Sequence, residues 1–215
     1  MIGRRVVVTG IGLVTPLGLT VADNWSAVVE GRSGIRTIPE FIEAGLNTTF
    51  AGRIQGLDPE QYIDKQSQRR LDPFVLYGWV AAQAAFQDAG LTDFIFDPAR
   101  IGVAMGSGIG GVHHIVQQHH NLMSGGPRKV SPFFVPGSIV NMVAGFVSLQ
   151  LNLQGPNIAL ATACATGNHN IAVAAQLVAT GATDVMVAGS AEYASTTLAM
   201  AGFGNAKALS TRNDS

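Results

Sequence analysis

The stretch Gly155-Pro156-Asn157-Ile158-Ala159-Leu160-Ala161-Thr162-Ala163-Cys164-Ala165-Thr166-Gly167-Asn168-His169-Asn170 contains the only cysteine of this chain. Residues 158–162 form a short apolar run behind a Gly-Pro turn, which predicts a buried strand. Residues 165–180 are rich in alanine, carry no charged side chain and stop at Gly181, which predicts a buried helix with a glycine stop. Cys164 is therefore predicted to lie in the first turn of a helix that directly follows a strand.

Two roles fit a cysteine at this position. Unpaired N–H groups and the positive end of the helix dipole favour a thiolate at a helix start, which is what a nucleophile requires. A free cysteine in apolar surroundings also commonly serves as a small core residue. The position of Cys164 alone leaves both interpretations open.

The rest of the chain alternates apolar strands with helices, which predicts an α/β fold with a mainly parallel sheet covered on both faces. The irregular and more highly charged segment 35–64 is expected to be a surface excursion. The predicted strands are residues 5–9, 101–105, 158–162 and 185–189. The predicted helices are residues 21–30, 68–89, 112–122, 138–151 and 166–180, with Asp72-Pro73 marking either a first-turn proline or a late start of the second helix.

Composition narrows the class of protein. The 215 residues carry a net charge of −1 and only 13% charged side chains, which gives no reason to expect nucleic acid or an anionic membrane as partner. No acidic residue lies between Asp97 and Asp184, so this half of the chain is expected to be buried in a layered fold or against another subunit. A single cysteine excludes an internal disulfide, and no apolar run resembles a signal peptide or a membrane span. We therefore expect a soluble cytoplasmic protein.

A glycine cluster and a histidine cluster suggest ligand sites that their spacing does not support. Residues 106–111 read GSGIGG and satisfy the G-x-G-x-x-G pattern after a predicted strand, but the next acidic residue is Asp184, far beyond the position that binds a ribose. The glycines are expected instead to let backbone segments pass closely. No two histidines of the segment 113–120 are three or four residues apart, so a solvated polar face is expected rather than a metal site.

His169 is the histidine nearest to Cys164 in the sequence. It follows Cys164 by five residues, which places it roughly 140° around a helix and about 7.5 Å along it. This arrangement is poor for a Cys-His catalytic pair, so His169 is not expected to activate the thiol.

Several segments in a fixed order make the chain resemble the N-terminal half of a β-ketoacyl-acyl carrier protein synthase of the bacterial type II kind. The resemblance covers nearly the whole chain, 1–215, as one N-terminal domain. It implies a thiolase-like layered fold made of two pseudo-duplicated halves, of which this chain is the first. The matching segments are residues 6–12 (VVVTGIG), 106–111 (GSGIGG), 125–136 (GGPRKVSPFFVP), 141–145 (NMVAG), 161–164 (ATAC) and 202–212 (GFGNAKALSTR).

The resemblance implies roles for individual residues. Cys164 matches the family nucleophile, and its own backbone N–H contributes half of an oxyanion hole. Ile109 and Phe134 match positions that line the acyl pocket at a dimer interface, and Phe203 matches a gating phenylalanine beside the cysteine. The family also has a basic patch that docks the acidic carrier protein. At one basic position of this patch the present chain has Gln66, next to Lys65. The residues that match the rest of that patch are Arg69, Arg70, Arg128, Lys129 and Lys207.

The resemblance also implies a reaction, namely transfer of an acyl chain to cysteine followed by decarboxylative Claisen condensation with malonyl-acyl carrier protein in fatty-acid elongation. The family uses two histidines, a lysine and a glycine-rich loop from its C-terminal half for the condensation, and none of the five histidines here matches those two. We therefore expect a truncated or split synthase that is inactive in condensation by itself. No metal or dissociable cofactor is implied, and a homodimer is expected once a second half is supplied.

Three alternatives remain at this point. The chain could be a non-catalytic module that binds acyl carrier protein, or one that pairs with a separately encoded C-terminal half. It could also be a polyketide-pathway relative, because the matching segments do not separate the pathways. A thiolase-like acyltransferase that uses coenzyme A esters shares the fold but not the basic docking residues.

Overall fold

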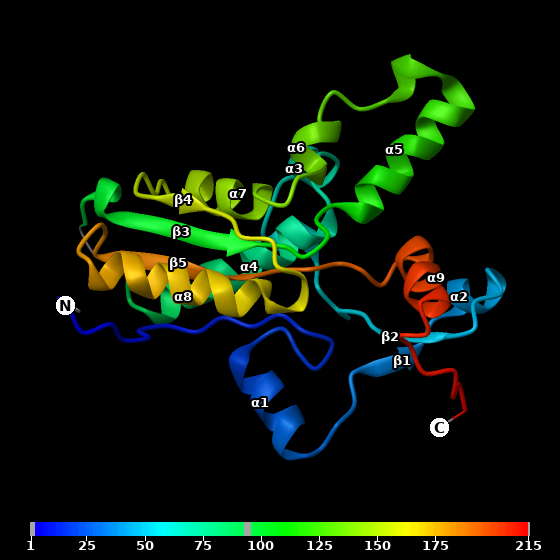
Figure 1. Ribbon diagram of the computed structural model, residues 1–215, viewed down its shortest axis with the longest axis horizontal. Coiled ribbons are helices and arrows are strands. Elements are labelled where there is room, and N and C mark those ends of the chain that lie inside the picture. The colour runs from blue at the N-terminus through cyan, green and yellow to red at the C-terminus, as the bar shows by residue number, and fades with distance from the viewer. Residues whose placement is uncertain (1–2, 93–95, 215) are drawn as a thin grey trace.

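The computed structural model describes residues 3–92 and 96–214, which form two small sheets and surrounding helices (Figure 1). A three-stranded parallel sheet has the order β4-β3-β5, and a separate antiparallel pair joins β1 to β2. The strands are β1 (Ile35–Thr37), β2 (Phe50–Gly52), β3 (Ile101–Gly106), β4 (Asn157–Ile158) and β5 (Val185–Ser190).

Helices occupy most of the remaining chain. No helix among the described residues is both long enough and apolar enough to cross a membrane. The α-helices are α1 (Val21–Val29), α2 (Pro39–Glu43), α3 (Lys65–Gln68), α4 (Pro73–Asp88), α5 (Val112–Gly125), α6 (Phe134–Ser138), α7 (Met142–Gln150), α8 (Thr166–Ala179) and α9 (Thr197–Asn205). The short 3₁₀ helices are η1 (Pro59–Gln61), η2 (Pro98–Arg100), η3 (Pro127–Lys129) and η4 (Ala163–Ala165).

Strand β3 is the centre of the fold, and all six of its residues are buried. Because side chains alternate along a strand, Ile101, Val103 and Met105 point into a core shared with α4 and α7. Helix α8 packs on β3 and β5 from the other face (Figure 1). The predicted α/β architecture, a parallel sheet with helices on both faces, is confirmed.

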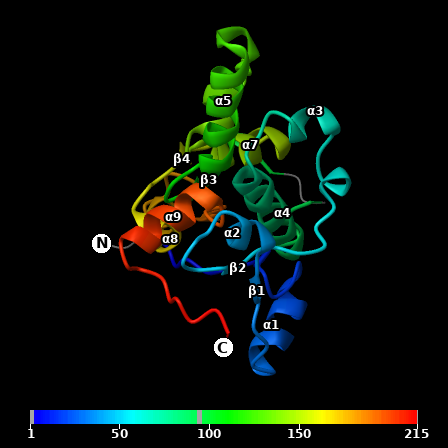
Figure 2. The same cartoon turned by 90° about the vertical axis from the view of Figure 1, so that its right-hand side faces the viewer.

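The main core lies between the sheet and the pair α4–α7. Its fully buried side chains include Phe74, Val75 and Val147. Trp79 donates its indole N–H to the carbonyl of Tyr62 at 3.2 Å, so the polar atom of this large side chain is satisfied inside the core. Burial explains the scarcity of charged residues between Asp97 and Asp184 for β3 and α7. Helix α5, in the same stretch, projects from the body with most of its surface exposed (Figure 2).

Two predicted helices begin later than the sequence pattern suggested. Helix α4 starts at Pro73 rather than at residue 68, because the carboxylate of Asp72 accepts the N–H of Phe74 and fixes the start there. The predicted helix 138–151 is in fact α7, which starts at Met142 after a break that follows α6.

Two predicted strands are wrong in whole or in part. Residues 5–9 form no strand, because this segment has no partner strand among the described residues, and Val7 and Val8 are 64% and 80% exposed. Strand β4 ends at Ile158 instead of residue 162, because the side chain of Asn170 pairs with the backbone of Leu160 in place of a strand. A strand needs a partner as well as an apolar run.

The segment 35–64 is more regular than predicted. It contains the antiparallel pair β1–β2 and helix α2, which lie beside α9 (Figures 1 and 2). Met200, the buried residue of α9, packs with Ile38 and Phe41 in a second small core. Residues 35–64 therefore form a packed lobe against α9.

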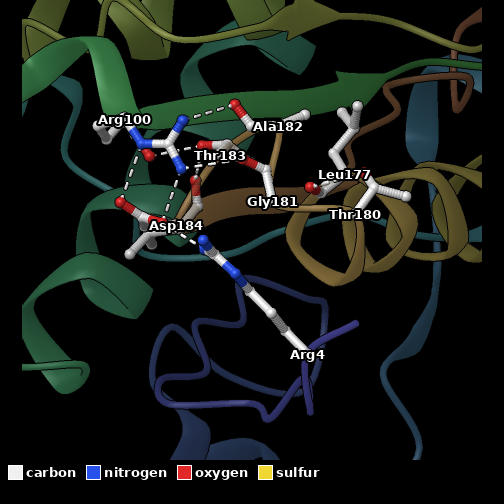
Figure 3. A network of polar contacts seen from close by, with 9 residues as sticks. Arg4, Arg100, Leu177, Thr180, Gly181, Ala182, Thr183 and Asp184 are labelled. Carbon is white, nitrogen blue, oxygen red and sulfur yellow. Dashed lines mark hydrogen bonds and ion pairs between the residues drawn. The ribbon is translucent and has the colours of Figure 1, made fainter. Parts of the chain in front are cut away.

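An ion-pair network joins the start of the chain to the sheet (Figure 3). The guanidinium group of Arg100 donates two hydrogen bonds to the carboxylate of Asp184, at 3.0 and 2.8 Å. The same group donates to the carbonyls of Gly181 and Ala182, which fixes the turn between α8 and β5. Arg4 approaches Asp184 from the opposite side at 2.7 Å.

This network should make stability depend on acidity. Hydrogen bonds from Arg100, and next from Arg4, hold the pKa of Asp184 far below its usual range. A lowered folded-state pKa stabilises the fold above the unfolded pKa of about 3.9, and this contribution is lost as the pH falls below that value. Asp184→Asn should therefore lower the melting temperature at pH 7, and the difference from wild type should shrink toward about pH 2.

Thermal melts of both proteins across this pH range measure the effect. Glu43→Gln, which removes an exposed carboxylate on α2, is the matched control and should leave the melting temperature nearly unchanged. A deficit of Asp184→Asn that is equally large at pH 7 and at pH 2 would contradict the assignment to the ionised carboxylate.

Candidate active site

Cys164 lies in η4, at the turn that leads from β4 into α8, and its side chain is exposed. Parallel strands β3 and β5 end on the same side of the sheet, at Gly106 and Ser190. The 3₁₀ turn pairs the Ala165 N–H with Thr162 and the Thr166 N–H with Ala163. The N–H of Cys164 comes directly before these two donors along the chain. Its role in binding an oxyanion stays a prediction.

The residue before the cysteine has a strained backbone. Ala163 has a φ of +53°, in the left-handed region that residues with a Cβ rarely adopt. The hydroxyl of Thr166 accepts the N–H of Thr162 at 2.9 Å and donates to the carbonyl of Ala163 at 2.7 Å. These two bonds hold the N–H of the residue before the strained one and the carbonyl of the strained residue itself.

A fully buried amide fixes the chain just before this turn. The Oδ1 atom of Asn170 accepts the N–H of Leu160 at 3.1 Å, and its Nδ2 donates to the carbonyl of Thr166 at 2.9 Å. A longer contact, 3.4 Å, joins Nδ2 to the carbonyl of Leu160. His169 shares a hydrogen bond of 2.8 Å with the Thr162 hydroxyl, so its ring contacts the loop before the cysteine. That His169 does not activate Cys164 stays a prediction.

The glycine cluster 106–111 brings the end of β3 and the loop after it against this turn. The sequence predicted close backbone approach at these glycines, but not this neighbour. A Cβ on Gly106 would come within 3.0 Å of the Leu160 carbonyl oxygen, and one on Gly108 would lie 3.3 Å from the carbonyl oxygen of Ala163. These glycines therefore serve close backbone approach.

Glu192 anchors the same loop and was missed from the sequence. Its carboxylate accepts hydrogen bonds from the Ser107 hydroxyl at 3.1 Å and from the N–H groups of Gly108 and Ile109 at 3.0 Å each. An acidic residue just after a strand, in a stretch with few other charges, was the available signal. Thr166 and Asn170 were also missed, although their spacing of four residues places them on one face of α8.

Comparison with known proteins identifies the family. The sequence model described as "Beta-ketoacyl synthase, N-terminal domain" matches residues 3–215. This chain belongs to the β-ketoacyl synthase family. It is 55% identical over 211 residues to the 3-oxoacyl-[acyl-carrier-protein] synthase 2 of Vibrio cholerae and 46% identical to that of Coxiella burnetii. Each match covers 98% of this chain and 51% of the relative. The chain thus spans about half the length of these relatives.

Solved structures agree with the fold of this family. A β-ketoacyl synthase from Burkholderia phymatum superposes with a TM-score of 0.88 at 32% identity, over 98% of this chain and 52% of that one. A ketosynthase complex with the acyl-carrier protein of a type II polyketide system matches with a TM-score of 0.81 at 25% identity, over 96% of this chain and 56% of that one. The thiolase-like α/β fold implied by the sequence is confirmed.

The acyl-pocket residues implied by the β-ketoacyl synthase resemblance lie on three different elements. Ile109 is in the glycine loop, where its N–H is held by Glu192 and its side chain is 42% exposed. Phe134 begins α6 and stacks on the ring of His114, with 6.5 Å between ring centroids. Phe203 lies on helix α9 and is also 42% exposed. Their joint role around one acyl chain stays a prediction.

The basic residues of the proposed carrier-protein patch are only partly gathered. Arg69 and Arg70 line a shallow cavity of about 410 Å³ together with Lys65, and the guanidinium carbon of Arg70 lies 4.1 Å from the centroid of the Phe133 ring. Gln66 and Ser131 complete the lining. The other members lie on η3 (Arg128 and Lys129) and after α9 (Lys207), and all three are exposed.

One histidine corrects the prediction of a solvated polar face. His113, His119 and His120 are exposed as expected, but His114 is only 2% exposed. Asp72 accepts its backbone N–H and Phe134 covers its ring, so the side chain faces the core, and burial lowers the pKa of His114. The described residues contain no group of three or more side chains that could hold a metal ion.

Proposed function

We propose that Cys164 accepts an acyl chain from acyl carrier protein as a thioester, the first half of the 3-oxoacyl-[acyl-carrier-protein] synthase reaction of fatty-acid elongation. The observation that carries this proposal is the position of the cysteine: an exposed thiol at a strained turn before α8, at the carboxyl end of a parallel sheet. Membership of the β-ketoacyl synthase family supports the same role.

The chemistry follows from the turn. The sulfur of Cys164 attacks the thioester carbonyl of the incoming acyl group, and the carbonyl oxygen becomes an oxyanion that the Cys164 N–H stabilises. Collapse breaks the bond to the pantetheine sulfur of the carrier. The proton lost by the Cys164 thiol ends on the released pantetheine thiol, so the step needs no oxidant or further reactant.

The condensation step is proposed for the whole synthase. A malonyl group on a second carrier would lose carbon dioxide, and the resulting enolate would attack the acyl group on Cys164. The resemblance assigns this step to histidines, a lysine and a loop of the other half of the family fold, which match nothing in these 215 residues. We therefore propose that this chain acylates without condensing.

Acyl carrier protein is the proposed partner, and the cavity around Arg69, Arg70 and Lys65 is its proposed docking site. Clustered guanidinium and ammonium groups complement an acidic partner and steer its approach. The polyketide ketosynthase complex with an acyl-carrier protein is a related precedent. The full synthase is proposed to be a homodimer.

Incubation of the purified chain with acyl-carrier protein should add the mass of one acyl group to the protein, detected by intact-mass spectrometry. Cys164 is the sole cysteine, so the modification maps to one residue, and Cys164→Ala is the matched control that should stay unmodified. The acylation rate should fall with added salt, because screening weakens contacts between exposed charges.

Three outcomes separate the alternatives. A chain that binds acyl-carrier protein but never becomes acylated would overturn the proposal in favour of a binding module. Equal acylation by acyl-coenzyme A and acyl-carrier protein would favour a thiolase-like transferase. Formation of 3-oxoacyl product after malonyl-carrier protein is added would contradict the absence of condensation.

A further inference from the structure

We infer that the side chains of Asn170 and Thr166 form a clamp that positions Cys164 for acyl transfer, and that the speed of the cysteine's chemistry depends on this clamp. Both residues lie on α8, and neither is one of the residues that the family resemblance marks as functional. The inference rests on the proposed function of Cys164. Neither side chain is assigned a bond to substrate, so both are positioning residues.

The clamp is fully inside the protein although the residues that it holds are exposed. Asn170 is 0% and Thr166 2% exposed, whereas Cys164 and both residues before it lie at the surface. Buried hydrogen bonds are protected from water and resist exchange of partners, because a broken bond would leave a buried polar atom unpaired. Asn170 and Thr166 therefore form a rigid, buried support beneath the exposed Cys164.

The two side chains bind backbone groups of Leu160, Thr162 and Ala163 on the path to the cysteine. Asn170 holds Leu160 through both its N–H and its carbonyl, as a neighbouring strand would. Thr166 holds the N–H of Thr162 and the carbonyl of Ala163. The amide of Asn170 also donates to the carbonyl of Thr166, which ties the two halves of the clamp together.

The strained residue explains why the clamp matters for chemistry. A left-handed φ at a residue with a Cβ is energetically unfavourable and persists only where surrounding contacts enforce it. Thr166 binds on both sides of Ala163, the residue that carries this strain directly before Cys164. Without these bonds, Ala163 would relax and redirect both the thiol and the N–H of Cys164. Small displacements of reacting groups cost up to about a hundredfold in rate.

The first test replaces Asn170 by leucine, which is similar in size but forms no hydrogen bonds. Asn168→Leu is the matched control, because Asn168 is the same residue type on the same helix but is exposed. We expect Asn170→Leu to lower the saturating rate of Cys164 acylation by roughly ten- to hundredfold, with little change in the carrier-protein concentration at half-saturation. Asn168→Leu should behave as wild type.

The second test keeps the inference falsifiable if Asn170→Leu does not fold. Thr166→Val removes the hydroxyl with almost no change in shape, and Thr166→Ser restores it. We expect Thr166→Val to lower the saturating rate and Thr166→Ser to recover most of it, with circular dichroism confirming that each variant is folded. A purely structural role would move the melting temperature without this split between rate and half-saturation.

A small alkylating reagent separates failure of this inference from failure of the proposed function. Iodoacetamide reacts with the single cysteine and requires no acyl chemistry, and its rate should also fall in the clamp variants and recover in Thr166→Ser. If wild type is alkylated but never acylated, the proposed function fails, and slower alkylation in the variants still supports the clamp. If folded Asn170→Leu and Thr166→Val match wild type in both reactions, the clamp inference is overturned.

Discussion

Asp72→Ala is expected to lower the free energy of unfolding by about 3 kcal/mol, because one buried carboxylate caps two helices. Its Oδ1 atom accepts the Phe74 N–H at 3.1 Å, and its Oδ2 accepts the His114 N–H at 2.8 Å. The residue is only 1% exposed, so neither N–H can turn to water once the carboxylate is removed. Alanine would leave the starts of both α4 and α5 unpaired.

Chemical denaturation measures this loss. Asp64→Ala is the matched control, since Asp64 caps the short helix α3 through the N–H groups of Gln66 and Ser67 but is exposed. Water can replace the Asp64 carboxylate there, so its loss should cost far less. Equal losses in the two variants would show that burial of the Asp72 carboxylate does not decide its contribution.

Acidity should act on Asp72 in the direction opposite to Asp184. Burial raises the pKa of Asp72, against the hydrogen bonds from His114 and Phe74 that lower it. A raised folded-state pKa gives stability that is fully present below the unfolded pKa and is lost as the pH rises through the folded pKa. The advantage of wild type over Asp72→Asn should therefore shrink as the pH rises from the unfolded pKa of about 3.9 through the raised folded-state pKa, and a constant difference would contradict this assignment.

The sequence predicted those parts of the fold that depend on local pattern. The apolar runs of β3 and β5 and the uncharged helix ended by Gly181 are readable one segment at a time, and together they place Cys164 before α8. Residues 5–9 have the same pattern as β5 but no partner strand within residues 3–92 and 96–214, and partnership is a property of the tertiary structure. The apolar pattern therefore predicts a strand there that does not form.

The supporting residues of the site were harder to predict for a different reason. Asn168 and Asn170 look alike in the sequence, yet one is exposed and the other completely buried under the cysteine turn. Asp72 and His114 are 42 residues apart, and only the folded chain shows that the carboxylate of one caps the helix of the other. Long-range hydrogen bonds of this kind leave no local pattern. The family resemblance marked Cys164 as the expected nucleophile, but it did not mark the side chains that bind the backbone before it.

Gly106→Ala is expected to destabilise the protein about as much as Asp72→Ala does. It should also slow the chemistry of Cys164. A Cβ at this position would come within 3.0 Å of the Leu160 carbonyl oxygen and lie 3.1 Å from Nδ2 of Asn170. Gly106 is buried in β3, and the atom in its way is backbone, so Leu160 must shift. Overpacking of this kind costs about 1–3 kcal/mol, and we expect a value near the upper end.

Gly189→Ala is the control that isolates this contact. Gly189 lies on the neighbouring strand β5, one register position before the Gly106–Ser190 pair, and a Cβ there would meet nothing within 4 Å. Its replacement should change the free energy of unfolding by no more than about 0.5 kcal/mol. Similar losses for the two variants would mean that general strand effects, rather than the approach of Leu160, govern the requirement for glycine at residue 106.

The effect on chemistry follows from the same displacement. Leu160 is held by Asn170 and lies four residues before Cys164, so a methyl group at residue 106 that moves Leu160 also disturbs the clamp from the side of the sheet. Folded Gly106→Ala protein should therefore show slower Cys164 acylation than Gly189→Ala, measured by intact-mass spectrometry at equal fractions of folded protein. A destabilised Gly106→Ala protein that is acylated at the wild-type rate would separate the packing of β3 from the positioning of the cysteine, and the glycine would then serve stability alone.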